Sequence, residues 1–434
     1  MGRDDSRGDK RIPPRMYSPY LIDRMTRVRT TREFSIAKYD RALLPRGHGQ
    51  LMTMAGTFTR RYPSRDHCMQ MMSFFSTSSG LVIHTKDSTG SLSDWEVIPG
   101  NKLRIHFYGP EPEIEMQVIP PTVEAAALVY KKWALRQPWA QQTRQRAPDY
   151  GVIATAPNPN LAQQAISLET LSKRFPSPMA AWITNWRKYP FDNAFPNYEP
   201  NSRQNFSKLL SNLKHARCDA FPYINALLWD ERLAEFQLGE SVAVQSRFLS
   251  YRPYSQTAPW LLYACPASEE WQRVIVETRE SLRDAEDYLS SGIYLDMLVA
   301  AGPFLCFSKD HAHRPGDPLA WQQGVRKILS MMKGSIMSEG NAEIYLNQVD
   351  LLLMHLFTEQ RDTVPLWNLV YGDLSRVVGW RMPNSVTPIT VGNEIDRAVS
   401  FGASCYGSPW MTHAIQEALL TPGFRELATR LGIT

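Results

Sequence analysis

The sequence predicts an α/β protein in which an antiparallel β-sandwich domain precedes a (β/α)8 TIM barrel. The barrel is predicted because, after about residue 178, short apolar runs alternate with amphipathic helical segments, as in parallel sheets with crossover helices. The sandwich is predicted because residues 50–120 hold short β-type runs separated by Gly, Ser, Asp and Pro. A length of 434 residues with 43% hydrophobic residues allows two such units.

The chain divides into four predicted segments. Residues 1–45 form a flexible basic arm, since cationic residues gather near the N-terminus with little periodicity. Residues 46–140 hold the sandwich, which is shorter than expected of a full domain, and a bridging helix. That helix begins after Thr122 and is stopped by Pro138. Residues 141–177 form a linker, and residues 178–434 form the barrel.

Eight apolar runs are the candidate barrel strands: 180–186, 220–230, 258–266, 292–298, 335–340, 349–355, 364–373 and 398–407. Helices are expected near 202–217, with Ser202 as N-cap, near 268–290 and 319–333, and at the C-terminal end. An open doubly wound sheet is the alternative. No GxGxxG motif follows any of the runs, and this absence argues against a nucleotide-binding protein.

Composition narrows the function classes. The net charge is +5, and most of the cationic residues are spread along the chain, so we expect no nucleic-acid partner. Five scattered cysteines without CxxC spacing predict neither a zinc ribbon nor a disulfide framework, and they suit a reducing compartment. No apolar run reaches membrane-spanning length and the first residues are polar, so a cytoplasmic protein without a membrane partner is expected. The sequence leaves the oligomeric state open.

The sharpest candidate site is a pair of carboxyl groups. Asp296 ends the apolar run GIYLD, and Glu339 ends the run SIMSE. A charge beside a buried strand is costly unless it is paired or functional. Carboxyls on the C-terminal ends of adjacent barrel strands would face each other, as a glycosidase nucleophile and acid require. The alternative is a structural Asp cap with a hydrogen-bonded Glu.

Further polar and aromatic residues follow the candidate strands. As substrate-binding residues we expect Trp186, Asp192, Asn225, Trp229, Asp230, Tyr263, Asn341 and Tyr371, together with His311 and His313 from the loop after residue 298. The HAH motif could also bind zinc with Cys306 and Asp310, but two histidines at i, i+2 without a clear third ligand are weak evidence. No cofactor and no resident metal are therefore expected.

Several motifs resemble those of a family of uncharacterised glycosidase-like proteins. They are AFPYINALLWD, LYACPASEEWQ, GIYLDMLVAAGPFLCFSKDHAHRPGDP, SIMSEGNAEIYLNQVDLLLMH and VPLWNLVYGD. The family carries a TIM barrel related to the α-galactosidase and endo-α-N-acetylgalactosaminidase superfamily, with an N-terminal β-sandwich. The resemblance implies that Asp296 is the nucleophile and Glu339 the acid/base, with Glu343 as an alternative acid. Family members usually have a fuller sandwich and further C-terminal β structure.

Three functions are compatible with the sequence. The first is a retaining glycoside hydrolase that cleaves an α-linked glycan through Asp296 and Glu339. The second is a non-catalytic carbohydrate-binding barrel, with Trp186, Trp229 and Trp321 as stacking platforms. The third is a metal-dependent hydrolase built on His311 and His313.

Overall fold

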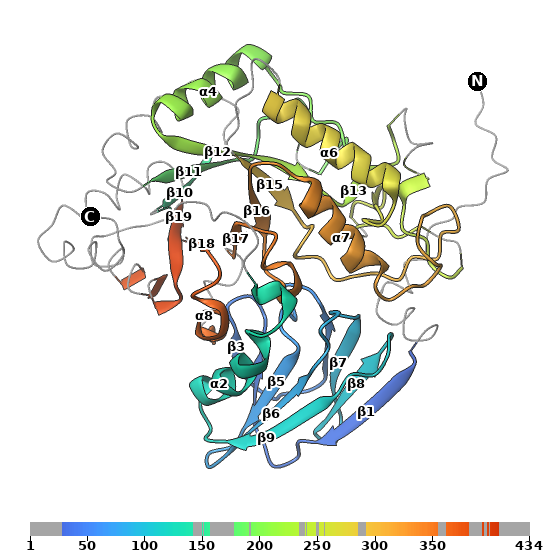
Figure 1. Ribbon diagram of the computed structural model, residues 1–434, viewed down its shortest axis with the longest axis vertical. Coiled ribbons are helices and arrows are strands. Elements are labelled where there is room, and N and C mark those ends of the chain that lie inside the picture. Colours follow the sequence, from blue (N-terminus) through green and yellow to red (C-terminus); the bar gives the residue numbers. More distant parts are fainter. Residues whose placement is uncertain are drawn as a thin grey trace, which may run out of the picture.

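The computed structural model consists of an antiparallel β part and a barrel of parallel strands, joined by helix α2 (Val123–Ala134) (Figure 1). It describes residues 28–141, 150, 152–156, 178–190, 192–233, 239, 241–248, 251–255, 257–284, 292–354, 362–381, 393–394, 397–398 and 400–407.

The antiparallel part is built of two sheets. One has the order β1-β8-β7-β4 and the other the order β3-β2-β5-β6-β9. The strands are β1 (Thr30–Ser35), β2 (Arg41–Leu44), β3 (Gln50–Thr53), β4 (Phe58–Tyr62), β5 (Met71–Phe75), β6 (Gly80–Thr85), β7 (Ser93–Ile98), β8 (Lys102–Phe107) and β9 (Ile114–Ile119). Strand β5 lies at the centre of its sheet and all five of its residues are buried, as its apolar residues on both faces predict.

The predicted arm over residues 1–45 is wrong for its last part, because β1 and β2 lie within it. β1 pairs with β8 over its whole length, and β2 lies between β3 and β5. The side chains of β1 are mostly exposed, so it carries little apolar pattern despite its hydrogen bonds. The sandwich therefore begins at Thr30. Residues 1–27 of the predicted arm lie outside the described residues.

Helix α2 connects the two parts. The Thr122 hydroxyl accepts a hydrogen bond from the Ala125 N–H (3.2 Å), so the predicted N-cap is confirmed. The helix ends at Ala134, before a short 3₁₀ turn over Pro138–Ala140. It packs against α8 (Leu366–Tyr371) on one side and β6 on the other.

Eight parallel strands close into a barrel. They are β10 (Val152–Ala156), β11 (Met179–Ile183), β12 (Cys218–Asn225), β15 (Gly292–Asp296), β16 (Ser335–Glu339), β17 (Leu351–Leu353), β18 (Val377–Arg381) and β19 (Ala403–Gly407). Pairing of β10 with β19 closes the ring. The described helices between barrel strands are α4 (Arg203–His215), α6 (Glu269–Asp284), α7 (Ala320–Met331) and α8, and the Ser202 N-cap of α4 is confirmed.

Two predicted barrel strands are wrong. Residues 258–266 contain β14 (Leu261–Tyr263), which forms an antiparallel pair with β13 (Leu228–Asp230) outside the barrel. The run 220–230 divides because the Asn225 side chain accepts a hydrogen bond from the Leu227 N–H (3.0 Å), a turn that ends β12. Residues 364–373 contain helix α8 (Leu366–Tyr371), whose buried residues follow a helical period.

Two barrel strands were missed. β10 lies in the predicted linker over residues 141–177, as a five-residue run next to Gly151 and Pro157. β18 contains Gly379 at a register shift against β19, and a glycine inside a short run weakens its strand pattern. Before β15 the prediction contains one wrong strand, β14, and lacks one true strand, β10. These two errors cancel in the count, so Gly292–Asp296 is the fourth barrel strand, as predicted. The closing helix predicted after residue 407 lies outside the described residues.

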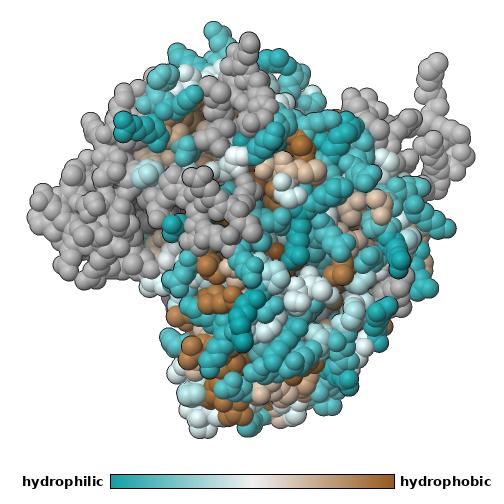
Figure 2. Space-filling model, viewed as in Figure 1, coloured by the Kyte–Doolittle hydropathy of each residue, from teal (hydrophilic) through white to brown (hydrophobic). Residues whose placement is uncertain are grey.

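The visible surface is largely hydrophilic, with a brown area at the lower left (Figure 2), where Figure 1 places α2 and β9. On these elements Met116, Val118 and Leu128 are exposed. Across the described residues, none of the helices combines the length and apolar character needed to cross a lipid bilayer.

Candidate active site

Three polar side chains lie at one level at the C-terminal ends of neighbouring barrel strands. Asn225 on β12 pairs with Asp296 on β15, and Leu295 pairs with Ser338, which puts Asp296 level with Glu339 on β16. Side chains alternate along a strand, and the residues two positions earlier belong to the barrel's inner apolar cluster. Asn225, Asp296 and Glu339 therefore point inward, above that cluster.

The Asp296 carboxyl accepts hydrogen bonds from three side chains. The Tyr223 hydroxyl donates to Oδ2 at 3.1 Å, Asn225 Nδ2 donates to the same oxygen at 3.2 Å, and the Tyr294 hydroxyl donates to Oδ1 at 3.3 Å. Donors stabilise the ionised form of a carboxyl group. The two tyrosine rings stack with their centroids 5.9 Å apart, which holds both hydroxyls in place.

The electrostatics of Asp296 contain opposing contributions. Burial raises its pKa well above the usual range, and the nearby charge of Glu339 raises it further. The Tyr223 and Tyr294 hydroxyls and the Arg65 cation lower it. Two carboxyls that repel each other in this way do not ionise together easily, so the charge of Glu339 favours the protonated form of Asp296. A nucleophile and a general acid need that division of charge.

The sandwich domain contributes a cation to this end of the barrel. Arg65 lies between β4 and β5 and forms an ion pair with Glu339, which is only 8% exposed. The Arg65 backbone N–H donates a hydrogen bond to the Ala300 carbonyl (3.0 Å), and this bond anchors Arg65 to the loop after Asp296. At Gly340, with φ +65°, a Cβ would lie 3.0 Å from the Arg65 Cβ, so glycine permits this approach.

Sequence reasoning missed Arg65 because it lies in another domain, and it also missed Tyr254. Burial raises the pKa of Tyr254, and the charges of Asp192, Asp296 and Glu339 raise it further. All three carboxyls therefore lie within electrostatic range of this hydroxyl. The predicted residue Asp192 is half-buried at this end, and burial raises its pKa.

Tyr263 lies next to this group. Its ring meets the ring of Tyr254 at 68°, with centroids 6.1 Å apart, and it also packs on Phe304. It reaches this position from β14, outside the barrel. The prediction that Tyr263 ends a barrel strand is wrong, although it does contact Tyr254.

The tryptophans expected to stack on sugar are buried in the core. Trp186 stacks on Phe206 (4.7 Å between centroids) and donates to the Tyr223 carbonyl (2.9 Å). Trp229 packs on Trp271, and Trp321 is 2% exposed. An indole without an open face cannot stack on a ligand, so this arrangement does not support their predicted binding role.

Asp230 is occupied by contacts within the protein. Burial alone would raise its pKa, but the Arg232 guanidinium (2.7 Å) and the N–H groups of Ala194 and Arg232 lower it. Arg232 in turn lies over the Trp260 ring, 4.4 Å from its centroid. The Asp230 carboxylate thus stabilises the region around β13. Both of its oxygens already accept hydrogen bonds within the protein, which argues against a contact with substrate.

Glu343, the alternative acid, is fully buried between the two domains. Its carboxyl accepts hydrogen bonds from the hydroxyls of Tyr130 (2.8 Å) and Tyr371 (2.6 Å) and from the Gln70 N–H (3.0 Å). Burial raises its pKa to about 7. Tyr371 belongs to α8 and is also fully buried, so the structure places both residues in the interface and not among the inward-pointing groups of the barrel.

Asn341 is likewise an interface residue. Its side chain is buried and donates to the Gly47 carbonyl (3.0 Å) and to Cys68 Sγ (3.3 Å), both in the sandwich. The remaining predicted residues, His311 and His313, meet Cys265 and Cys306 in a separate cluster. Of the thirteen predicted site residues, Asp296, Glu339, Asn225 and Asp192 share one end of the barrel.

This fold is found in glycosidases. The structure matches alpha-N-acetylgalactosaminidase NagBb from Bifidobacterium bifidum with a TM-score of 0.68 at 12% identity, covering 90% of this chain and 75% of that one. It matches the alpha-galactosidase TtGalA from Thermus thermophilus with a TM-score of 0.62 at 12% identity, covering 89% and 92%. At these identities the likeness is one of fold.

The chain belongs to the family described as Domain of unknown function (DUF6259), which matches residues 116–382. A Monosiga brevicollis protein named "Putative glycoside hydrolase 22789" is 22% identical over 234 residues. That match covers 46% of this chain and 19% of the relative, so the chain spans about a fifth of the relative's length. These matches confirm the resemblance to a glycosidase-like family.

Proposed function

We propose that this protein is a retaining glycoside hydrolase with a (β/α)8 barrel, and that it cleaves an α-linked glycan. The observation that carries the proposal is the placement of Asp296 and Glu339 side by side on neighbouring strands, pointing inward at the C-terminal end. Neighbouring strands lie about 4.8 Å apart, which suits the short carboxyl separation of retaining enzymes.

In the proposed mechanism Asp296 attacks the anomeric carbon while Glu339 protonates the departing glycosidic oxygen. A covalent glycosyl–enzyme intermediate forms, and the aglycone leaves as an alcohol. Glu339 then takes a proton from water, and the resulting hydroxide displaces Asp296 to release the sugar with its original anomeric configuration. Tyr223 and Asn225 hold Oδ2 of the nucleophile in place through their hydrogen bonds.

Two observations bear on the roles within the pair. The three donors around Asp296 favour its ionised form, as a nucleophile requires. Its raised pKa and the Arg65–Glu339 ion pair favour the reverse assignment. The experiment must therefore identify the nucleophile and not only show that both residues matter.

The competing functions receive less support. The buried indoles of Trp186, Trp229 and Trp321 leave the carbohydrate-binding hypothesis without its stacking platforms. A metal-dependent hydrolase needs a metal with an open position for water. His311 and His313 lie with two cysteines, which would complete a four-coordinate site.

Turnover of nitrophenyl α- and β-glycosides tests the proposal, beginning with galactose and N-acetylgalactosamine, the sugars named for NagBb and TtGalA. Asp296→Ala and Glu339→Ala should each lower kcat by roughly a thousandfold. Asp219→Asn is a matched control, because this carboxyl lies near the other end of β12, bonded to Tyr150. Its activity should be close to wild type.

Azide assigns the two roles. With an α-glycoside, azide replaces a missing nucleophile from the opposite face and gives the β-glycosyl azide. When the acid/base is missing, azide attacks the covalent intermediate and gives the α-glycosyl azide. We expect the β-azide from Asp296→Ala and the α-azide from Glu339→Ala; the opposite products would reverse the roles. Wild-type turnover that survives Asp296→Ala would refute the proposal.

A further inference from the structure

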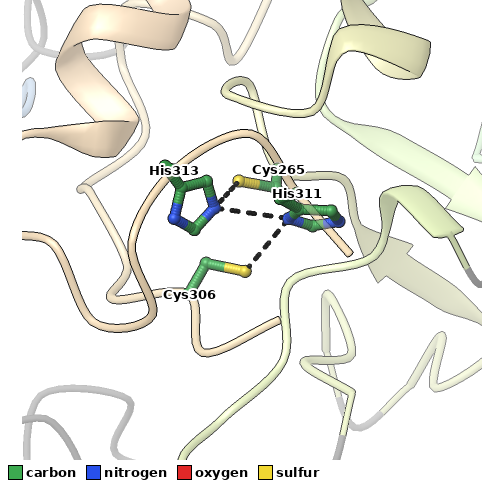
Figure 3. A group of neighbouring side chains, drawn as sticks. All are labelled: Cys265, Cys306, His311 and His313. Atoms are coloured by element: carbon green, nitrogen blue, oxygen red, sulfur yellow. Dashed lines mark hydrogen bonds between the residues drawn. The ribbon is translucent and has the colours of Figure 1, made fainter. Parts of the chain in front are cut away.

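Four side chains with metal-binding atoms converge at a place apart from the carboxyl pair (Figure 3). Cys265 lies between β14 and α6, whereas Cys306, His311 and His313 lie on the loop between β15 and α7. One atom of each lies within 4.8 Å of the other three. Three of these residues are buried and His313 is half-buried.

The spacing fits a tetrahedral ion. Bonds of about 2.3 Å for Zn–S and about 2.05 Å for Zn–N place sulfur and nitrogen ligands about 3.6 Å apart and two nitrogen ligands about 3.4 Å apart. Cys265 Sγ lies 3.4 Å from His313 Nε2, and Cys306 Sγ lies 3.4 Å from His311 Nδ1. The two nitrogens are 3.3 Å apart. All three separations are those of ligands around one centre.

The far nitrogens of both rings are already engaged. His311 Nε2 lies 2.7 Å from the Ser241 carbonyl oxygen, and His313 Nδ1 lies 3.0 Å from the Arg314 carbonyl oxygen. A carbonyl oxygen only accepts, so these nitrogens carry the protons. In the neutral rings, the nitrogens that face each other are then unprotonated, and a cation between them relieves the repulsion of their lone pairs. Carbonyl partners of this kind orient metal-bound histidines.

We propose that Cys265, Cys306, His311 and His313 bind one zinc ion. Two thiolates and two imidazoles in a tetrahedral arrangement favour zinc among the common divalent ions. Four protein ligands leave no position for water or substrate, so the ion is structural. The sequence indicated His311, His313 and Cys306 as possible ligands, but it did not indicate Cys265, which lies 41 residues before Cys306. Asp310, considered as a ligand from the sequence, is exposed.

The zinc would fix a long loop that begins at the proposed nucleophile. The loop leaves Asp296, passes the Ala300 carbonyl that anchors Arg65, and reaches Cys306. Cys265 donates its N–H to the Val242 carbonyl (2.7 Å), so the ion also ties in the segment before β14. The ion would thereby add one further connection among three segments that backbone hydrogen bonds already join, such as the one from the Phe307 N–H to the Gln245 carbonyl (2.8 Å).

Metal analysis of the tag-free protein, purified without chelator, tests the site. We expect about one zinc per chain by mass spectrometry, and loss of that zinc in Cys265→Ser and Cys306→Ser. Cys218→Ser is the matched control, since Cys218 is also buried but lies on β12. It should keep its zinc. His313→Cys should keep zinc as well, because three cysteines and one histidine also bind it.

Replacement and removal of the metal give independent readouts. Cobalt exchanged into the site should give the intense visible absorption of a tetrahedral thiolate complex. Stripping zinc from the wild type with a chelator should lower Tm by at least about 5 °C, and added zinc should restore it. Absence of zinc with no response of Tm to added zinc, or a Cys265–Cys306 disulfide in fresh protein, would overturn the proposal. These readouts do not depend on glycosidase activity.

Discussion

Replacement of Glu343 by glutamine tests the electrostatics of the domain interface. In the wild type, burial raises the pKa of Glu343 from its ordinary 4.5 to about 7. The folded protein then holds a proton that the unfolded chain has lost, so stability falls as pH rises from about 4.5 through 7. Glutamine cannot ionise, and this part of the pH dependence should disappear.

The magnitude follows from the two pKa values. With 4.5 in the unfolded chain and about 7 in the folded protein, linkage gives a loss of roughly 2.5 kcal/mol between pH 5 and pH 8. The neighbouring Tyr130 and Tyr371 do not titrate in this range, because burial raises the pKa of both well above 10. The charge of Asp296 contributes in both proteins and cancels in their difference.

Urea denaturation at a series of pH values measures the effect. The stability of the wild type minus that of Glu343→Gln should fall by roughly 2.5 kcal/mol from pH 5 to pH 8. The glutamine amide changes the hydrogen-bond partner of one tyrosine hydroxyl. This change adds a constant, pH-independent amount to the difference in stability between the two proteins. Glu113→Gln replaces an exposed glutamate that pairs with Lys86 and leaves Glu343 intact, so as the control it should keep the pH dependence of the wild type. Equal slopes in wild type and Glu343→Gln would refute the reasoning.

Three further predictions concern the barrel. Arg65→Met removes a cation that lowers the pKa of Asp296, so the acidic limb of the kcat/KM profile should move to higher pH; an unmoved limb in stopped assays would contradict this. Gly292→Ala places a Cβ 2.3 Å from the Phe221 ring inside the barrel and should cost about 1–3 kcal/mol of stability, measured by urea denaturation. Gly340→Ala forces a side chain onto φ +65° against Arg65, so turnover of aryl glycosides should fall several-fold while zinc content stays unchanged.

The barrel was predictable because β11, β12, β15 and β16 are short apolar runs, and helices α4, α6 and α7 separate them along the chain. The position of the carboxyl pair was predictable because each carboxyl belongs to the last residue of such a strand. The prediction survived one false strand and one missed strand before β15, since Asp296 remained at the end of the fourth. The false strand β14 has the same apolar character as a barrel strand, and sequence alone does not show that its partner is β13.

The environment of the pair was harder to predict. Arg65 precedes Glu339 by 274 positions and is one of many arginines, so only the docking of the domains shows its role. Glu343 was considered an acid because it shares a motif with Glu339. A short 3₁₀ turn directs it into the interface, where tyrosines from α2 and α8 enclose it. Such long-range partners leave no local pattern in the sequence.

The position of Arg65 restricts how this protein can be recombined. Its guanidinium comes from the sandwich, whereas Glu339 comes from the barrel, so neither domain carries the whole set of charges. A barrel grafted onto a foreign N-terminal domain would lose the Arg65 cation. Glu343 would remain in the interface of that chimaera, but it would lack the hydrogen bond from the Gln70 N–H. The two domains should therefore be inherited as a pair, and shuffling experiments should recover active chimaeras only when the crossover lies outside residues 65–343.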